Sequence, residues 1–253
     1  MNRTVARAHA STMTASAAQL PPMTAEDLPY EPPPGLALLH EDADLLVFDK
    51  PSGLLSVPGR GAHKADCLSA RAQARWPDAL VVHRLDLSTS GLVLMARGLA
   101  MQRLLSQAFA TRAVDKRYEA VVDGLPAPQS APGDGWHSID APLMADWPRR
   151  PLQKVDAAGR PSLTLWRVKA AYRELHAAWL LLAPHTGRSH QLRVHLAHIG
   201  HPILGDALYG DAAVRARAPR LLLHASALAF AHPRSGQPMR FDCPAPFVPP
   251  GPH

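Results

Sequence analysis

A polar stretch between two apolar runs holds the first residues that could do chemistry. His83–Gly91 reads HRLDLSTSG, and the flanking residues 81–82 and 92–96 are apolar. Arg84 and Asp86 are two residues apart, so in an extended backbone their side chains point to the same side. A buried, unpaired charge costs several kcal/mol or shifts its pKa. The two residues therefore either form an ion pair that braces the turn, or present a carboxylate to a ligand.

A second polar stretch, 185–195 (HTGRSHQLRVH), runs into an expected helix. A glycine turn before a helix N-terminus favours anions, because free amides and the helix dipole point at them. Arg188 adds a planar guanidinium that suits phosphate or carboxylate. Arg193 adjoins the apolar stripe of the helix and needs a carboxylate partner, for which Asp86 is the candidate. Such a pair would keep Asp86 ionised and nucleophilic; the alternative is an arginine that extends to solvent.

Histidines are frequent in the same region, but their spacing matches no standard zinc pattern. There is no HExxH motif, and neither Cys67 nor Cys243 lies near them in the sequence. We therefore expect no metal, and expect packing or hydrogen bonding by the five histidines of this region: His185, His190, His195, His198 and His201.

Tyr118 lies in an alternating strand pattern, KRYEAVV, on the same side as Ala120 and Val122. One interpretation is a core tyrosine whose hydroxyl has a partner. The other is an aromatic plate for a nucleobase, with Lys116 and Arg117 beside it for phosphates. The sequence leaves both open.

The elements that must position these residues follow from periodicity. Residues 36–39 and 45–48 predict a hairpin, and the Asp86 stretch predicts strand–turn–strand. Residues 101–108 predict a helix that buries Met101, Leu104, Leu105 and Ala108. Residues 126–162 predict a long irregular connection with basic spots. Ser189 is the expected N-cap of a helix that ends at Gly200. Further predicted elements are a helix at 69–76 and strands at 116–122, 163–172, 175–183, 220–230 and 239–243.

Many strands with few helices between them predict an α+β fold around an antiparallel or mixed sheet, not a doubly wound parallel sheet. Residues 1–34 are Pro-rich near their end and predict a flexible tail, which leaves 35–253 as one catalytic domain.

Composition narrows the class of protein. The 253 residues carry a formal charge of +6, which favours a polyanionic partner such as nucleic acid. Two cysteines without CxxC spacing favour a reducing cytoplasm over a disulfide scaffold. No apolar run is long enough for a membrane span, and no signal-peptide pattern opens the chain.

The ordered motifs resemble the RluA family of pseudouridine synthases. The resemblance rests on KPSGLLSVP from Lys50, on HRLDLSTSG, on Lys116-Arg117-Tyr118, and on HTGRSHQLRVH followed by GHPILGD at 200–206. It runs from about residue 36 to 248. Residues 146–151 (DWPRRP), 153–155 (QKV) and 219–225 (PRLLLHA) are closest to family members that modify both tRNA and 23S rRNA.

This resemblance implies a mixed, mainly antiparallel sheet with flanking helices and a central RNA cleft. Asp86 would be the catalytic aspartate, and Arg84 would fill the gap left by the flipped uridine. Tyr118 would stack on the flipped base and could help to take its C5 proton. Either Arg193 or Arg188 would pair with Asp86. RNA contacts are predicted for Arg84, Lys50, Lys116 and Arg188, with no cofactor, a monomeric state, and tRNA and 23S rRNA as partners.

Two other functions fit parts of the sequence. A non-catalytic RNA-binding or ribosome-assembly protein could use the same basic cleft and would not need Asp86. A glycosidase usually needs two carboxylates, and no second acid stands out near Asp86. Both are less favoured than uridine isomerisation.

Overall fold

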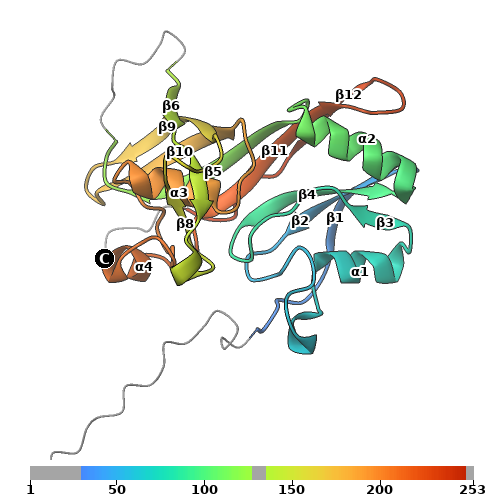
Figure 1. Cartoon of the computed structure of the whole chain (residues 1–253), viewed down its shortest axis with the longest axis horizontal. Coiled ribbons are helices and arrows are strands. Elements are labelled where there is room, and N and C mark those ends of the chain that lie inside the picture. Colours follow the sequence, from blue (N-terminus) through green and yellow to red (C-terminus); the bar gives the residue numbers. More distant parts are fainter. Residues whose placement is uncertain (1–29, 127–134, 249–253) are drawn as a thin grey trace, which may run out of the picture.

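The computed structural model describes residues 30–126 and 135–248 (Figure 1). In these residues ten strands form one sheet, in the order β1-β2-β4-β11-β5-β10-β9-β6, with β3 paired to β4 and β12 to β11. The bounds are β1 (Ala37–Glu41), β2 (Leu45–Lys50), β3 (Ala79–Val81), β4 (Ser90–Arg97), β5 (Asp115–Asp123), β6 (His137–Asp140), β9 (Leu163–Tyr172), β10 (Ala177–Pro184), β11 (Leu223–Ala231) and β12 (Pro238–Asp242). The mixed, mainly antiparallel α+β fold is confirmed.

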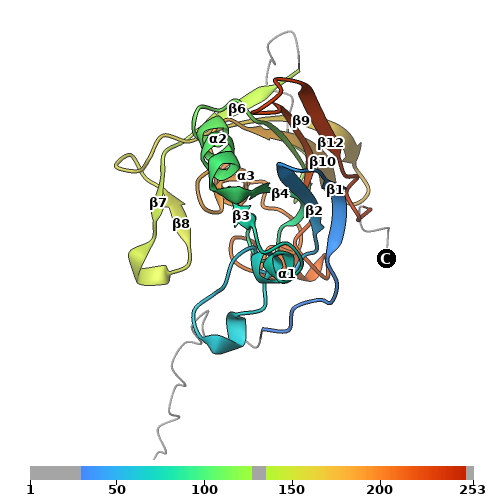
Figure 2. The same ribbon diagram turned by 90° about the vertical axis from the view of Figure 1, so that its right-hand side faces the viewer.

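Helices cover the sheet, and a small hairpin stands apart from it. The helices are α1 (Leu68–Arg75), α2 (Gly98–Ala110), α3 (Gln191–His198) and α4 (Ala212–Ala216), with 3-10 turns at Ala62–Lys64 and Trp147–Arg149. Strands β7 (Leu143–Ala145) and β8 (Gln153–Val155) pair only with each other, and the hairpin projects from the body of the molecule (Figure 2). Each of the first three helices contributes to an apolar cluster: Leu68 and Ala72 from α1, Met101 and Leu105 from α2, Leu192 and Leu196 from α3.

The sheet has a seam where β4 meets β11. Figure 1 shows β1–β4, α1 and α2 on one side of it, and β5, β9, β10 and α3 on the other. This pairing is parallel and includes only two residue pairs, His224 with Ser90 and Ala225 with Gly91. Gly91 has φ 109°, and a Cβ there would lie 2.3 Å from the Ala225 carbonyl oxygen. The seam therefore requires glycine at position 91.

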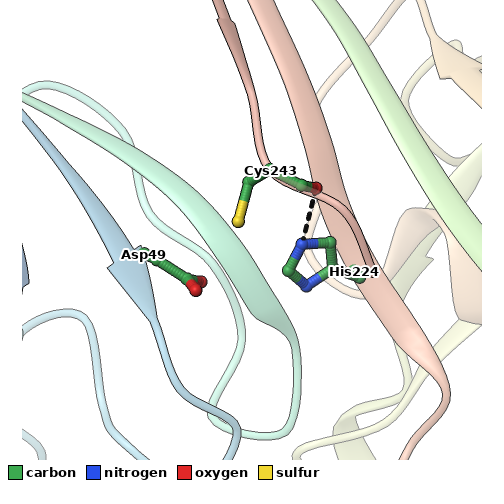
Figure 3. Close-up of side chains that lie close together, drawn as sticks. All are labelled: Asp49, His224 and Cys243. Carbon is green, nitrogen blue, oxygen red and sulfur yellow. Dashed lines mark hydrogen bonds between the residues drawn. The ribbon is translucent and has the colours of Figure 1, made fainter. Parts of the chain in front are cut away.

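Polar side chains, two of them buried and one half-buried, lie together at the seam (Figure 3). Asp49, His224 and Cys243 are of types that bind metals, and their ligand atoms lie within 4.8 Å of one another. Hydrogen bonds already engage both ring nitrogens of His224, Nδ1 with Ser90 Oγ (2.9 Å) and Nε2 with the Cys243 carbonyl (3.0 Å). Burial and the adjacent Asp49 raise the pKa of the Cys243 thiol to about 12. The cluster thus links β2, β4, β11 and the chain after β12 through hydrogen bonds.

Several local predictions are confirmed, and some are wrong. The first hairpin and the strand–turn–strand around Asp86 are present, and α2 buries Met101 and Leu105. Leu104, however, is 48% exposed. The connection predicted as irregular over 126–162 contains β6, β7 and β8, which are too short to give a periodic pattern. Helix α3 begins after His190, a left-handed residue with φ 55°, so Ser189 is not its N-cap.

The predicted tail is attached to the domain before residue 35. The Tyr30 hydroxyl donates to the Asp66 carbonyl (2.8 Å) and accepts from the Leu55 amide (3.0 Å). The rest of that tail, residues 1–29, lies outside the described residues. None of the described helices is both long and apolar enough to cross a bilayer.

Candidate active site

The loop between β3 and β4 carries Asp86, and the segment after β2 holds that loop. Ser56 Oγ donates to the Leu85 carbonyl (2.8 Å) and accepts from the Leu85 amide (3.1 Å). Ser52 Oγ donates to the Ser88 carbonyl (2.8 Å), and the Gly53 amide donates to the carbonyl of Leu87 (2.9 Å). The residues on both sides of Asp86 are therefore fixed, while its carboxylate stays partly exposed toward a cavity.

Lys50 supports this loop from within the protein. It has no exposed area, and its ammonium donates to the carbonyls of Pro51, Leu54 and Leu87 at 2.9, 2.7 and 3.3 Å. Burial lowers the pKa of Lys50 to about 7, although nearby Asp86 opposes the shift. The prediction that Lys50 contacts RNA disagrees with this position, because no part of its side chain reaches the surface.

Arg193 approaches Asp86 from α3 but is anchored elsewhere. Its Nε and Nη2 donate to the two carboxylate oxygens of Asp206, at 2.8 and 2.6 Å. Its Nη1 lies 3.8 Å from Asp86 Oδ2. Arg193 is 4% exposed and Asp206 is fully buried. The predicted contact with Asp86 is present as a long ion pair, and the main partner is an aspartate that the sequence reasoning missed.

Asp206 is fully buried, and protein donors replace water around its carboxylate. Besides Arg193, the amides of Leu208 (2.9 Å) and Tyr209 (3.2 Å) donate to Asp206 Oδ1. The preceding Gly205 has φ 75°, and a Cβ there would lie 1.9 Å from the Arg220 carbonyl oxygen. The Gly-Asp pair at the end of the GHPILGD motif was the available signal for this residue.

Tyr118 on β5 faces the same cavity as Asp86. Burial and the charge of Asp86 raise the pKa of its phenol above the ordinary value, so the hydroxyl is protonated at neutral pH. Tyr118 also packs against two apolar clusters on either side of the seam. Tyr118 is thus packed as a core residue and also lines the cavity, and its role as a plate for a nucleobase stays a prediction.

The loop before α3 is organised by Gln191. Its Oε1 accepts from the Thr186 hydroxyl (2.8 Å) and the Arg188 amide (3.0 Å). Its Nε2 donates to the Leu163 carbonyl (3.1 Å) and to Thr164 Oγ1 (3.0 Å). The loop is thus tied to β9 and forms the cavity wall opposite the Asp86 loop.

Two adjoining cavities form one basic cleft. The inner cavity, of about 110 Å³, is lined by Asp86, Tyr118, His190 and Arg193 among others. The outer one, of about 420 Å³, shares six lining residues with it: Arg84, Lys116, Tyr118, Thr186, Gly187 and Arg188. Arg112 adds a further cation, and none of the described residues that line the outer cavity is acidic. A negatively charged ligand is therefore favoured at the entrance to Asp86.

Arg188 serves this cleft and does not pair with Asp86. Its Nη2 donates weakly to the Pro161 carbonyl (3.4 Å). Its buried Nε has no hydrogen-bond partner among the described residues. The open choice between Arg188 and Arg193 thus resolves in favour of Arg193 on geometry. The remaining donor capacity of Arg188 suits a phosphate.

The histidines of this region mostly make hydrogen bonds, as expected. His195 contacts Thr164 Oγ1 (2.9 Å) and the Ala141 carbonyl (3.0 Å). His201 contacts the Asp123 carbonyl (2.9 Å), and His190 contacts the Tyr209 hydroxyl (2.6 Å). Elsewhere His83 accepts from the Leu94 amide (2.9 Å), and burial lowers its pKa to about 3.

The candidate site is an aspartate in a basic cleft, next to a buried arginine. Comparison with known proteins assigns the protein to a class. A model of the family described as RNA pseudouridylate synthase matches residues 44–198. The chain belongs to this family. It is an RNA pseudouridine synthase, an isomerase that converts uridine to pseudouridine within RNA.

Individual relatives agree with this assignment. The dual-specificity RNA pseudouridine synthase RluA of Escherichia coli (strain K12) is 46% identical over 221 residues, which cover 86% of this chain and 98% of the relative. RluA of Vibrio cholerae serotype O1 is 46% identical over 209 residues, which cover 81% of this chain and 82% of the relative. The structure of human RNA Pseudouridylate Synthase Domain Containing 1 superposes with a TM-score of 0.68 at 28% identity and covers 87% of this chain and 88% of that one.

Proposed function

We propose that Asp86 is the catalytic carboxylate of this isomerase, and that the uridine reaches it by flipping into the inner cavity. The observation that carries the proposal is the placement of Asp86. It is the acidic residue among the described residues that line this cavity, and it faces a cationic entrance. Isomerisation breaks an N-glycosidic bond and makes a C-glycosidic one, so the detached base must rotate without escaping. A small cavity of about 110 Å³ suits that requirement.

Asp86 could attack the ribose, or remove a ribose proton to give a glycal intermediate. Both routes need the ionised form, and the Arg193 guanidinium faces this carboxylate at 3.8 Å. The buried pair with Asp206 keeps Arg193 in place. We therefore assign to Arg193 the role of a fixed positive charge that faces the Asp86 carboxylate.

The remaining residues handle the flipped base and the RNA backbone. Extruding a base costs a few kcal/mol, less from a loop than from a duplex. Arg84 is exposed at the cavity mouth and is assigned to the space that the uridine vacates. Tyr118 stacks on the base; its protonated phenol favours this role over that of the base that removes the C5 proton. Lys116, Arg188 and Arg112 contact phosphates.

The substrates are proposed from the relatives. Those named RluA are dual-specificity RNA pseudouridine synthases. Residues 146–151, 153–155 and 219–225 resemble family members that modify both tRNA and 23S rRNA, so we assign to this chain the 5′ side of a tRNA anticodon loop and a hairpin of 23S rRNA. A monomer acting in the cytoplasm is the corresponding proposal for assembly and location.

Carbodiimide modification followed by primer extension tests the proposal. Anticodon stem-loops and 23S rRNA transcripts are incubated with the protein or with Asp86→Ala. We expect a new stop at one uridine with the first and none with the second. A stop that survives Asp86→Ala would overturn the role of Asp86. Release of free uracil would instead indicate a glycosidase, and binding without any stop would favour an RNA-binding protein.

A further inference from the structure

The wall of the inner cavity contains a pair of side chains to which the proposed chemistry assigns no role. His190 Nδ1 lies 2.6 Å from the hydroxyl oxygen of Tyr209. His190 lines the cavity with Asp86 and Arg193. Tyr209 lies behind it, and the guanidinium carbon of Arg193 is 5.1 Å from the centre of the Tyr209 ring. The pair therefore touches the arginine that faces Asp86.

The other contacts of Tyr209 favour one direction for this hydrogen bond. The Gln153 amide donates to the same hydroxyl oxygen (2.9 Å), so that oxygen already accepts one bond. Burial raises the pKa of Tyr209 to about 12, and the phenol keeps its proton. The phenol proton is therefore available to His190 Nδ1, and burial lowers the pKa of His190. We take Nδ1 as the acceptor of this bond, with the imidazole proton on Nε2.

Tyr209 also connects the cavity to a separate part of the fold. Gln153 is the first residue of β8, in the hairpin that pairs with no strand of the main sheet. Figure 1 shows β8 beside α3. The exposed end of this hairpin carries Trp147, which is 65% exposed, with the Arg150 guanidinium 3.3 Å from its ring centre. A basic, aromatic hairpin tip of this kind suits RNA.

We propose that Tyr209 and His190 act as one positioning unit, which the Gln153 amide of β8 holds in place and which fixes Arg193 against Asp86. The inference rests on the proposed function, because it assigns these residues to the reaction of Asp86. Asp206 determines where the guanidinium is anchored, and Tyr209 covers one face of it. Small displacements of a catalytic group reduce rates steeply, by as much as a hundredfold per ångström.

The test uses full-length protein and single-turnover formation of pseudouridine at saturating protein, with RNA affinity measured separately. Tyr209→Phe removes the hydroxyl and keeps the ring over Arg193. We expect its rate to fall at least tenfold, while its affinity for the stem-loop changes less than twofold. Tyr172→Phe is the matched control, since Tyr172 is the last residue of β9 and lines neither cavity. We expect Tyr172→Phe to keep the wild-type rate.

Variants at His190 separate the effect of losing the hydrogen bond from the effect of changing the left-handed backbone. His190 has φ 55°, which asparagine and glycine both tolerate. Asparagine places an acceptor near the position of Nδ1, so we expect His190→Asn to stay within threefold of the wild-type rate. His190→Gly should fall as far as Tyr209→Phe. The double variant Tyr209→Phe/His190→Gly should fall no further than either single variant, as expected for residues that act as a unit.

The outcomes distinguish this inference from the proposed function. If the wild-type protein makes pseudouridine and Tyr209→Phe matches Tyr172→Phe in rate, the positioning role is wrong and the role of Asp86 stands. If the rate losses of the two single variants multiply in the double variant, Tyr209 and His190 do not act as one unit, and the inference is also wrong. If the wild-type protein and all variants form no pseudouridine on either RNA, both the proposed function and this inference fail.

Discussion

Arg193 and Asp206 form a buried, two-fold hydrogen-bonded ion pair, and this pair leaves Arg193 Nη1 facing Asp86 at 3.8 Å. Asp206, which also accepts hydrogen bonds from two backbone amides, anchors the Arg193 guanidinium. Asp86 therefore does not need to form a close ion pair with Arg193. Its carboxylate stays accessible to a substrate in the cavity.

Breaking this anchor should cost both stability and activity. Asp206→Asn leaves the buried guanidinium without its main counter-charge, which costs about 3–5 kcal/mol. Denaturant unfolding should show this loss, and pseudouridine formation should fall with it. In Arg193→Met/Asp206→Leu, both charges are absent, so stability should recover. Activity should stay at least a hundredfold low, and a fully active double variant would refute the role of Arg193.

Lys50 should make the stability of the protein depend on pH. Its pKa is about 7 in the folded protein, below the ordinary value of 10.5. Between these values the unfolded chain binds more protons, so stability rises with pH. The unfolding free energy of the wild type relative to Lys50→Met should therefore increase by roughly 2 kcal/mol from pH 7 to pH 9. An unchanged difference would mean that Lys50 is not desolvated.

Arg112 should contribute to RNA affinity through charge alone. It lines the outer cavity with φ 62°, a conformation that asparagine tolerates. Arg112→Asn should weaken binding to all RNAs, and should reduce the slope of log affinity against log salt by about 0.7–0.9. The rate at saturating RNA should stay the same. Arg75→Asn, on an exposed arginine that lines neither cavity, is the control and should leave the slope unchanged.

Gly91 should be the more sensitive of two glycines with positive φ. At Gly91 a methyl group would meet the Ala225 backbone, whereas at Gly98 (φ 77°) it would meet no atom within 4 Å. Gly98→Ala should cost about 1–2 kcal/mol from backbone strain. Gly91→Ala adds a clash at the seam and should cost roughly 2 kcal/mol more. Equal losses in urea unfolding would indicate that the seam adapts to the methyl group.

The sequence alone predicted those features that depend on near neighbours in the chain. Alternating apolar runs around a polar turn were enough to predict the two strands beside Asp86. The same pattern placed Arg84 and Asp86 at one cleft, because residues two apart in extended backbone share a side. Ordered motifs from Lys50 to Asp206 indicated the family without any structure.

Tertiary structure decided which partners these residues have. Asp206 pairs with Arg193 because the turn after α3 brings the Asp206 carboxylate and two backbone amides together. No local sequence pattern predicts that Asp206 and Arg193 lie close to each other. Lys50 looked like a surface cation beside Pro51, yet three carbonyls from two loops enclose its ammonium. Tyr209 gained a role only because β8, α3 and the Asp206 turn meet in space. Side-chain type is set by the sequence, whereas burial and the identity of a partner depend on contacts between distant segments.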